Sequence, residues 1–213
     1  NRQCQPAFQP ETGSDYIRLT THNRMAESYN EEQLRNLPSK ACTFRAETDG
    51  NFPEYSYPAD FNLTLKKGAQ VMFIRNDNNG RYYNGRIGHV TYVDSSKIVV
   101  LCPGDDEAIE VEAETWENTK YTLNERTKQI EAEVQGTFRQ YPLRLAWAIT
   151  IHKSQGLTFE HAIIDAQAAF ASGQVYVALS RCKTLEGLVL ASPISSQAII
   201  NDSRVSDYLS LIH

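Results

Sequence analysis

Two segments of this chain carry side chains that could bind phosphate groups. Residues 148–159 read AITIHKSQGLTF, and residues 173–183 read GQVYVALSRCK, with Arg181 after an apolar run. Hydroxyl, amide and cationic groups suit phosphate oxygens, and such contacts with a nucleic-acid backbone do not depend on base sequence. A guanidinium can also stabilise the charge that develops when a phosphoryl group is transferred. Taken alone, Arg181 could equally be an ordinary surface arginine that follows a buried helix face.

The sequence contains no loop of the Walker type that would cradle a nucleotide. Residues 80–87 read GRYYNGRI and have the glycine spacing of such a loop, but Arg86 and Ile87 stand where Lys and Ser or Thr are required. The Asn-Gly dipeptides around this segment are typical of turns between strands. The acidic segment 104–117 follows Pro103 and is expected to be a solvated loop rather than a magnesium site.

The composition is that of a folded protein with a sizeable core. The 213 residues are 41% hydrophobic and 22% charged, which excludes a disordered chain and a disulfide mini-scaffold. No apolar run approaches the ~18 residues needed to cross a bilayer, so no membrane partner is expected. The four cysteines lack metal-ligand spacing, which predicts free thiols, no metal site and a cytoplasmic location. The chain opens on Asn1 and a polar stretch, which suggests a cut made within a longer protein.

The formal net charge of −5 argues against nucleic-acid binding, but the charges are segregated along the chain. Seven acidic and no basic residues lie within 104–117, whereas six basic and two acidic residues lie within 64–100. The segment 138–183, which contains both phosphate-type strings, holds five basic residues against two acidic ones. The overall charge therefore does not exclude a nucleic-acid partner for that segment.

The elements that must position these strings change in type along the chain. The first and last thirds alternate strands and helices, which is typical of a layered α/β domain. The expected elements are strands at 16–20, 41–46, 159–165 and 188–191 and helices at 23–37, 143–154 and 173–181. Pro142 can open the helix at 143–154, and Gly156 suits the left-handed residue that ends one.

The middle third contains short β-branched or alternating runs separated by turn residues, which is typical of a small barrel or sandwich. Strands are expected at 71–74, 86–93, 97–101 and 108–111, and residues 129–140 could add further strands. The simplest fold is therefore one α/β domain, split in sequence, that carries a small β insertion.

Taken together, four strings resemble the superfamily 1 DNA helicases of the RecD, Dda and Pif type. Residues 148–159 are similar to motif V of that family, and residues 173–183 are similar to its motif VI. Upstream, residues 19–30 (LTTHNRMAESYN) are similar to motif IV, and residues 65–75 (LKKGAQVMFIR) also match. The strings occur in the order of the family, and the resemblance spans nearly the whole chain.

The resemblance implies the second RecA-like domain of a helicase, a layered α/β domain without the P-loop, interrupted by a small SH3-like β-barrel. Residues 1–14 would be a polar lead-in or linker, residues 15–66 and 141–213 the RecA-like domain, and residues 67–140 the SH3-like insertion. The first RecA-like domain, which carries the Walker residues in the family, is not present in this sequence.

In these helicases ATP lies in a cleft between two RecA-like domains, and single-stranded DNA runs across both. The resemblance therefore implies the C-terminal motor half of an ATP-dependent DNA helicase. ATP and Mg²⁺ would be cofactors of the full-length enzyme, with none bound to this fragment, which alone is expected to be inactive. Its partners would be single-stranded DNA and the N-terminal RecA-like domain of the same chain, and translocation would run 5′ to 3′.

The resemblance also assigns residues to the nucleotide. Arg181 occupies the position of the arginine finger in motif VI and is the one catalytic residue expected here. The nucleotide-side residues would be Gln155, Gly156, Thr158, Gln174 and Arg181. Many relatives carry Glu at the position of Thr158, and in those relatives the Glu side chain contacts the nucleotide ribose.

A second group of residues would contact DNA. Its expected members are Thr21, His22, Thr150, His152, Lys153, Ser154, Tyr82 and Arg86. Alternatives remain for several positions: Asn23 could cap the following helix, the core could satisfy His152, and Trp147 is expected in the core rather than on DNA. Tyr82 and its neighbour Tyr83 could stack on bases.

A function of another class also fits these residues. A non-enzymatic module, in which an SH3-like barrel and its α/β support bind DNA or a protein partner passively, would explain the missing P-loop without a truncation.

Overall fold

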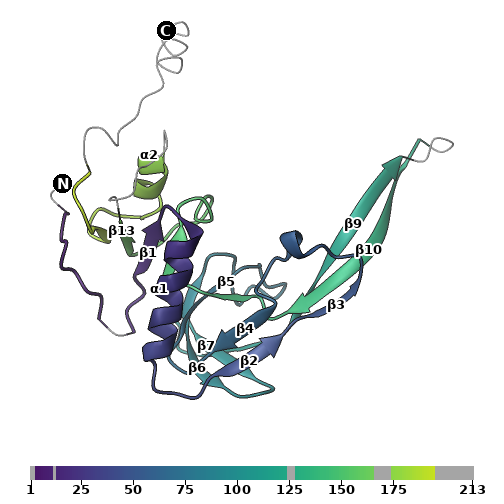
Figure 1. The fold of residues 1–213 in the computed structure, drawn as a ribbon, viewed down its shortest axis with the longest axis horizontal. Helices are drawn as coiled ribbons and strands as arrows, with labels where there is room; N and C mark the ends of the chain where they lie inside the picture. Colours follow the sequence, from purple (N-terminus) through teal and green to yellow (C-terminus); the bar gives the residue numbers. More distant parts are fainter. Residues whose placement is uncertain (1–2, 12, 124–127, 166–173, 195–213) are drawn as a thin grey trace, which may run out of the picture. The chain divides into compact units, whose positions relative to one another are not determined.

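The computed structural model describes residues 3–11, 13–123, 128–165 and 174–194. The chain forms two compact units, an α/β unit made of Asn1–Asn36 and Ala146–His213 and a β unit made of Leu37–Leu145 (Figure 1). The chain therefore leaves the α/β unit after one helix and re-enters it at Ala146.

These units differ in extent from the domains that the sequence suggests, because residues 37–66 and 141–145 lie in the β unit. Strand pairing explains the difference. β2 (Cys42–Arg45) pairs antiparallel with β4 (Asn62–Leu65), and β11 (Leu143–Leu145) pairs antiparallel with β5 (Gln70–Phe73). The expected order of strand 16–20, helix 23–37 and strand 41–46 favours parallel pairing of the two strands. Local sequence does not show, however, that the second strand pairs with β4 instead.

In the described residues, the sheet of the α/β unit has four parallel strands in the order β12-β1-β13-β14. Its elements are β1 (Ile17–Thr20), α1 (Asn23–Asn36), β12 (Ala148–Thr150), β13 (Ala162–Ile164), α2 (Gln174–Leu179) and β14 (Leu188–Leu190). All residues of β12, β13 and β14 are buried, as is usual for parallel strands covered on both faces. The strands expected near 16–20, 159–165 and 188–191 and the helix near 23–37 are confirmed.

The helix expected at 143–154 is wrong. Residues 143–150 contribute to β11 and β12, and residues 151–156 form a turn. A short apolar run of a buried parallel strand cannot be told from a buried helix by periodicity alone. Gly156 does take a left-handed conformation, with φ of 80°, but in the loop that follows β12. Trp147 is half-buried just before β12, where its carbonyl accepts a hydrogen bond from Arg18 N at 2.8 Å.

A buried amide on α1 completes the outer edge of β12. Asn30 Nδ2 donates to Ala148 O, and Ala148 N donates to Asn30 Oδ1, both at 2.8 Å. The side chain takes the place of a further strand and satisfies backbone groups that would otherwise be buried without partners. Helix α1 is thereby fixed to the strand that leads into the phosphate-type loop.

The lead-in adds to the opposite edge of the same sheet. Gln5 N donates to Leu190 O and Leu190 N donates to Gln3 O, both at 2.9 Å, so Cys4 pairs in parallel with Leu190 of β14. Further along, the Tyr16 ring lies 4.9 Å from that of Phe8, measured between centroids. The described part of the lead-in is therefore packed on the α/β unit.

The β unit consists of antiparallel strands in three sheets. A five-stranded sheet has the order β11-β5-β6-β7-β8, a three-stranded sheet has the order β3-β10-β9, and β2 pairs with β4. The remaining elements are β3 (Glu47–Gly50), a short 3-10 helix η1 (Glu54–Ser56), β6 (Ile87–Val93), β7 (Ile98–Leu101), β8 (Ile109–Val111), β9 (Glu114–Leu123) and β10 (Ile130–Gln140). The strands expected at 71–74, 86–93, 97–101 and 108–111 are confirmed, and 129–140 forms one long strand.

Gln140, at the end of β10, joins two of these sheets. Its side chain is buried, and its Nε2 donates to Phe44 O at 3.0 Å and to Asp60 O at 3.1 Å. Its Oε1 accepts a hydrogen bond from Tyr141 N at 2.9 Å. On the same strand, the buried Phe138 ring packs against Tyr57 at 4.7 Å between centroids. These contacts anchor the long strand to the rest of the unit.

Among the described residues, no helix combines the length and apolar character that spanning a membrane requires. The four cysteines are free thiols, and burial raises the pKa of Cys102 to about 11.

Replacing Asn30 with Ala is expected to destabilise the α/β unit by about 2–3 kcal/mol, because Ala148 would keep a buried N–H and C=O without partners. Urea unfolding followed by circular dichroism measures the change. Asn36→Ala makes the same chemical change at the exposed end of α1 and is expected to stay within about 0.5 kcal/mol of the parent. Equal stabilities for the two variants would contradict the role given to Asn30.

Candidate functional site

The strand order places a topological switch point beside β1. The chain goes from β1 to β12 on one side, and then crosses to β13 on the other side of β1. In open parallel sheets, ligands bind at the carboxyl ends of the strands near such a point. Thr20 of β1 pairs with Thr150 of β12, so the loops after both strands leave the sheet at the same level. The residues expected at motifs IV and V therefore share one edge of the sheet.

Two of the motif V residues shape the loop after β12. Thr150 is buried, and its Oγ1 accepts a hydrogen bond from Lys153 N at 3.3 Å. Ser154 is also buried, and its Oγ donates to Ile151 O at 2.7 Å. Both hydroxyls are buried and take part in hydrogen bonds that hold the turn. His152 and Lys153, at the top of the same turn, are exposed.

The residues after β1 present a helix N-terminus. His22 is exposed, and its Nδ1 lies 2.7 Å from Thr21 Oγ1. The carbonyl of His22 accepts the first helical hydrogen bond, from Ala26 N at 3.3 Å. His22 rather than Asn23 is thus at the cap position of α1. The N–H groups of the first helical turn favour an anion there.

Arg181 is held against the end of the motif V loop. Its Nη1 donates to Leu157 O at 3.0 Å, its Nε to Val177 O at 3.0 Å, and its Nη2 to Ser180 Oγ at 2.9 Å. Among the described residues, these bonds use three of the five N–H donors of a guanidinium, which leaves two for a ligand. The side chain is half-buried, and its direction is therefore set by the protein.

The backbone brings the two motifs together as well. Phe159 N donates to Arg181 O at 2.8 Å, and Lys183 N donates to Phe159 O at 2.9 Å. Gln155, Gly156 and Thr158, which are exposed, therefore lie on a loop whose end is joined to the segment that carries Arg181. Gln174, the remaining nucleotide-side residue, begins α2 and is half-buried.

Tyr82 and Arg86, the two residues of the β unit that are expected to contact DNA, both make side-chain contacts within the protein. Tyr82 is 3% exposed and stacks on Phe73 with 4.0 Å between centroids, so it has no free ring face for a base. Burial raises its pKa. Arg86 Nη2 pairs with Asp105 Oδ1 at 2.6 Å. The exposed tyrosine is Tyr83, at 59%, with the Arg86 guanidinium 5.9 Å from its ring centroid.

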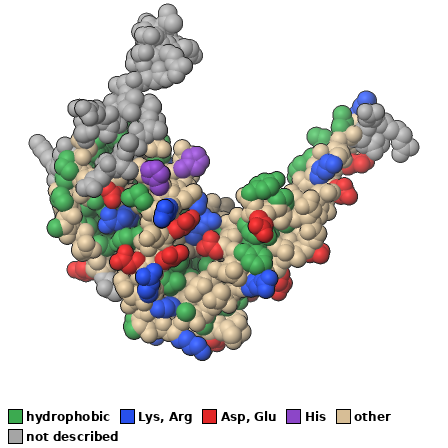
Figure 2. All heavy atoms as spheres, viewed as in Figure 1, with side chains coloured by type: hydrophobic (Ala, Val, Ile, Leu, Met, Phe, Trp, Pro, Cys, Tyr) green, Lys and Arg blue, Asp and Glu red, His purple; other side chains and the backbone are tan. Residues whose placement is uncertain are grey.

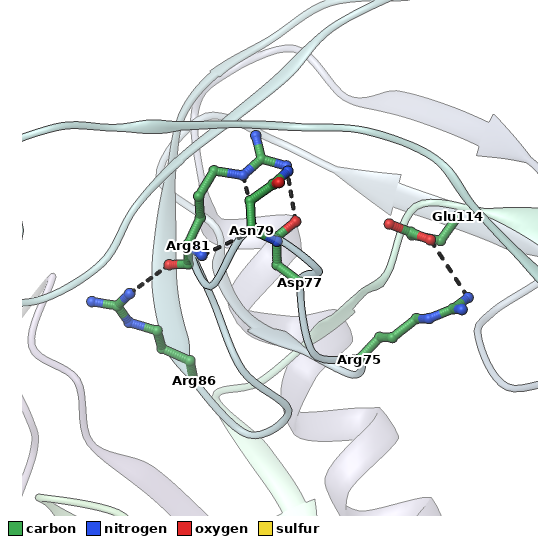
Figure 3. Close-up of polar contacts among 6 residues, drawn as sticks. All are labelled: Arg75, Asp77, Asn79, Arg81, Arg86 and Glu114. Carbon is green, nitrogen blue, oxygen red and sulfur yellow. Dashed lines mark hydrogen bonds and ion pairs between the residues drawn. The ribbon is translucent and has the colours of Figure 1, made fainter.

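Asp77 fixes the loop that carries these residues (Figure 3). Its carboxylate accepts hydrogen bonds from Asn79 N at 3.1 Å, from Arg81 N at 3.0 Å and from Arg81 Nη2 at 2.9 Å. The Arg81 side chain is the main reason that the pKa of Asp77 falls to about 2. Arg86 Nη1 in turn donates to Arg81 O at 2.8 Å, so several hydrogen bonds within the β unit hold this loop.

Sequence reasoning missed one charged group at the candidate site. Asp165 directly follows β13 at the same carboxyl edge, and its Oδ2 lies 3.9 Å from Arg18 Nη1. An acidic residue directly after a buried parallel strand is a signal that could have revealed it. In the parts of the chain that the structure describes, no three His, Cys, Asp or Glu side chains gather as metal ligands would. The donors of the candidate site are the Arg181 guanidinium, the His22 and His152 imidazoles, the Gln155 amide and the N–H groups at the start of α1. Donors of these kinds fit phosphate oxygens.

Comparison with known proteins places this geometry in a family. Residues 145–189 match the model of the UvrD-like helicase C-terminal domain. The chain is 37% identical over 202 residues to the ATP-dependent DNA helicase PIF1 of Homo sapiens, covering 88% of this chain and 29% of the relative. It is 32% identical over 232 residues to Pif1 of Psychrobacter sp., covering 87% of this chain and 35% of that protein. The chain thus spans about a third of these relatives.

Solved structures agree with the sequence relatives. A Bacteroides sp. Pif1 in complex with ADP-AlF4 is 39% identical and superposes with a TM-score of 0.88 over 99% of this chain and 48% of that one. A Bacteroides Pif1 bound to ssDNA, also 39% identical, has a TM-score of 0.74 over 99% of this chain and 48% of that one. The chain therefore belongs to the Pif1-like superfamily 1 helicases and corresponds to their C-terminal region.

Proposed function

We propose that this chain is the C-terminal motor part of an ATP-dependent DNA helicase, in which Arg181 acts as the arginine finger. The observation that carries the proposal is the fixed guanidinium, held by Leu157, Val177 and Ser180, with two N–H donors that make no bond to the described part of the chain. A planar fork of this kind matches the oxygens of a phosphoryl group in transfer. ATP with Mg²⁺ would be held mainly by an N-terminal RecA-like domain of the same protein.

Arg181 would act by presenting positive charge at a fixed place. A guanidinium that is already oriented needs no reorganisation when charge develops on the phosphoryl oxygens. Gln155, Gly156, Thr158 and Gln174 would line the same side of the nucleotide. Because Arg181 is supplied to a phosphate that another domain holds, the chain by itself would have negligible ATPase activity.

Single-stranded DNA would bind at the exposed part of the carboxyl edge. His22, His152 and Lys153 are exposed there, and the N-terminus of α1 adds backbone N–H groups. Thr21 would orient His22, whereas Thr150 and Ser154 would act by shaping the turn. The relatives described with ssDNA support this ligand class.

The β unit would be the SH3-like insertion of this family. Its antiparallel five-stranded sheet with short loops is compatible with a small barrel. Arg86, together with Tyr83 in place of the buried Tyr82, would be its contact with DNA. In the full-length enzyme, cycles of domain closure and opening would drive translocation in the 5′ to 3′ direction in the cytoplasm.

Replacing Arg181 with Ala in the full-length protein is expected to lower kcat for ATP hydrolysis by about 10³-fold or more, because the transferring phosphoryl group loses its fixed cation. The DNA concentration that gives half-maximal ATPase should change less than about threefold. Steady-state ATPase assays at saturating single-stranded DNA measure both.

Lys183→Ala is the matched control, since it removes an exposed cation from the same segment. Its ATPase should stay within about twofold of the parent. If Arg181→Ala kept its ATPase within about threefold and lost DNA binding instead, Arg181 would be a DNA contact and the passive binding module would be the better description.

Replacing Lys153 with Ala in the full-length protein is expected to weaken single-stranded DNA binding in a salt-dependent way. One phosphate contact fewer should reduce the slope of log K against log salt by about 0.7. Fluorescence anisotropy titrations at several salt concentrations give the slope. Lys120→Ala, an exposed lysine on β9, should leave the slope unchanged, and an equal slope for Lys153→Ala and the parent would remove Lys153 from the DNA site.

A further inference from the structure

Strand β10 ends within the β unit, whereas the chain segments on both sides of it continue. β10 pairs with β3 from Gly136 to Arg139 and with β9 as far as Gln140. Both partners run antiparallel to β10, so the segments beyond its end are those that precede β3 and β9 in the sequence. They are β2, separated from β3 by Ala46 alone, and β8, separated from β9 by residues 112–113.

The chain leaves the line of β10 at Pro142. Proline has no backbone N–H and cannot continue the hydrogen-bond ladder between two strands. Leu143 N donates to Tyr141 O at 2.8 Å, and the chain then continues as β11 beside β5. Among the described strands, β2 pairs only with β4 and β8 pairs only with β7. No described strand therefore joins the facing edges of β2 and β8.

A groove of about 550 Å³ lies at this place. Its lining includes residues 43–45 of β2, residues 110–113 at the end of β8 and residues 139–141 at the end of β10. The Tyr141 ring lies 4.9 Å from the Phe44 ring, measured between centroids, which fixes the lining where β10 ends. The groove is here called the strand slot, because it continues the line of β10 between two strands.

The edge of β2 presents backbone groups to the strand slot. In an antiparallel strand, the N–H and C=O groups of alternate residues point to opposite sides. Ala46 N donates to Phe61 O at 2.7 Å, on the side of β4. Thr43 and Arg45 therefore direct their N–H and C=O groups away from β4 and into the strand slot.

The same alternation applies to β8. Asp94 N donates to Lys97 O at 3.0 Å, so Lys97 faces β6 and its neighbour Ile98 faces β8. Ile98 pairs with Val111 of β8. Glu110, one residue before Val111, therefore directs its N–H and C=O groups away from β7 and into the strand slot. Two strand edges thus face one groove, and each can accept a further strand.

We propose that the strand slot binds an extended peptide segment of another protein, which pairs with β2 and β8 at once and runs in the direction of β10. The spacing suits one strand, because β10 itself separates β3 from β9 directly beside the slot. β2 has four residues and β8 has three. The slot therefore admits about four residues of an extended chain. This inference does not depend on the proposed function.

The walls of the strand slot alternate between buried and exposed side chains. Phe44 and Val111 are buried, whereas Arg45, Glu110 and Glu112 are exposed. A bound strand would therefore direct alternate side chains toward the protein and toward solvent. Small apolar or β-branched residues suit the first set of positions, and polar residues suit the second.

Two charges on opposite walls are available to the exposed side chains of the peptide. Within the described part of the chain, Arg45 lies 5.3 Å from the Phe61 ring centroid and forms no ion pair, and Glu112 forms none. Glu110, in contrast, pairs with Lys97 Nζ at 2.5 Å. A peptide with an acidic and a basic side chain two residues apart, both on its exposed face, complements Arg45 and Glu112.

A nucleic acid is a poor occupant of the strand slot. The lining contains Glu47, Glu110 and Glu112 against Arg45 and Arg139. Binding to a phosphate backbone requires an excess of cations. On the face drawn in Figure 2, the acidic and basic side chains of the described residues are interspersed over the β unit. The slot therefore favours a peptide, which it would recognise mainly through the main chain.

The test is hydrogen–deuterium exchange on the full-length protein with the synthetic peptide TEVKVT, acetylated and amidated at its ends. At a peptide concentration of about ten times the Kd, amide exchange in residues 43–45 and 110–112 should slow about tenfold. The same peptide N-methylated at its central Val and Lys loses an N–H donor toward each strand edge. It should slow exchange in neither segment, because the main-chain ladder cannot form.

A charge exchange tests the side-chain preference. Arg45→Glu should weaken binding of TEVKVT about threefold or more and strengthen binding of TKVKVT by a similar factor, as measured by anisotropy of fluorescein-labelled peptides. Lys120→Glu makes the same charge change on β9, outside the strand slot, and should leave both affinities unchanged. If Arg45→Glu fails to fold, Arg45→Gln should still weaken TEVKVT binding.

Several results would overturn the proposal. Equal protection by the N-methylated peptide would show that the strand edges are not used, and protection of other segments alone would place the peptide elsewhere. No protection at about 1 mM TEVKVT, where even a millimolar Kd slows exchange about twofold, would leave the slot without a peptide ligand. A dimer in sedimentation velocity that the peptide dissociates would assign the slot to a second copy, and competition by oligothymidine would assign it to a nucleic acid.

Discussion

The candidate site depends on the parallel register between β1 and β12. These two short strands are adjacent in the sheet although the whole β unit lies between them in the sequence. Thr20 lies beside Thr150, and this alignment sets the start of α1 level with the turn at 151–156. Among the strands that the structure describes, none pairs with the outer side of β12, and Asn30 occupies that place with two hydrogen bonds to Ala148, 118 positions away in sequence. One helix therefore both presents its N-terminus at the site and fixes the strand that carries the other half of it.

Arg181 shows why the two motifs need each other. The direction of its guanidinium depends on the Leu157 carbonyl, which belongs to motif V, and on the Val177 carbonyl one helical turn before it. A lysine at this position could place a charge but could not make three directed bonds to the protein and still offer donors to a ligand. The site thus requires an arginine for its geometry as much as for its charge.

Sequence patterns were sufficient to predict most of the helices and strands and the strings at the carboxyl edge of the sheet. They were not sufficient to predict features that depend on contact with a distant segment of the same chain. The run at 143–150 has the composition of a buried segment of either type, and only pairing with β5 and β1 makes it two strands. Tyr82 and Tyr83 are adjacent and chemically identical, yet one stacks on Phe73 and the other is exposed. The register of β9 with β10 could not be predicted because a bulge between Val134 and Gly136 shifts it, and local alternation there is weak.

Agreement with a motif is also not the same as contact with a ligand. Within one string of twelve residues, Thr150 and Ser154 are buried and hold the loop, whereas His152 and Lys153 are exposed. A small side chain with a hydroxyl suits each buried position, because the hydroxyl reaches a backbone group three residues away and the side chain occupies little volume. In the proposed site, the buried hydroxyls would be needed for the shape of the loop and the exposed cations for contact with the phosphate. Burial and hydrogen-bond partners, rather than membership of the string, therefore decide which substitutions should alter DNA binding directly and which should alter it through the shape of the loop.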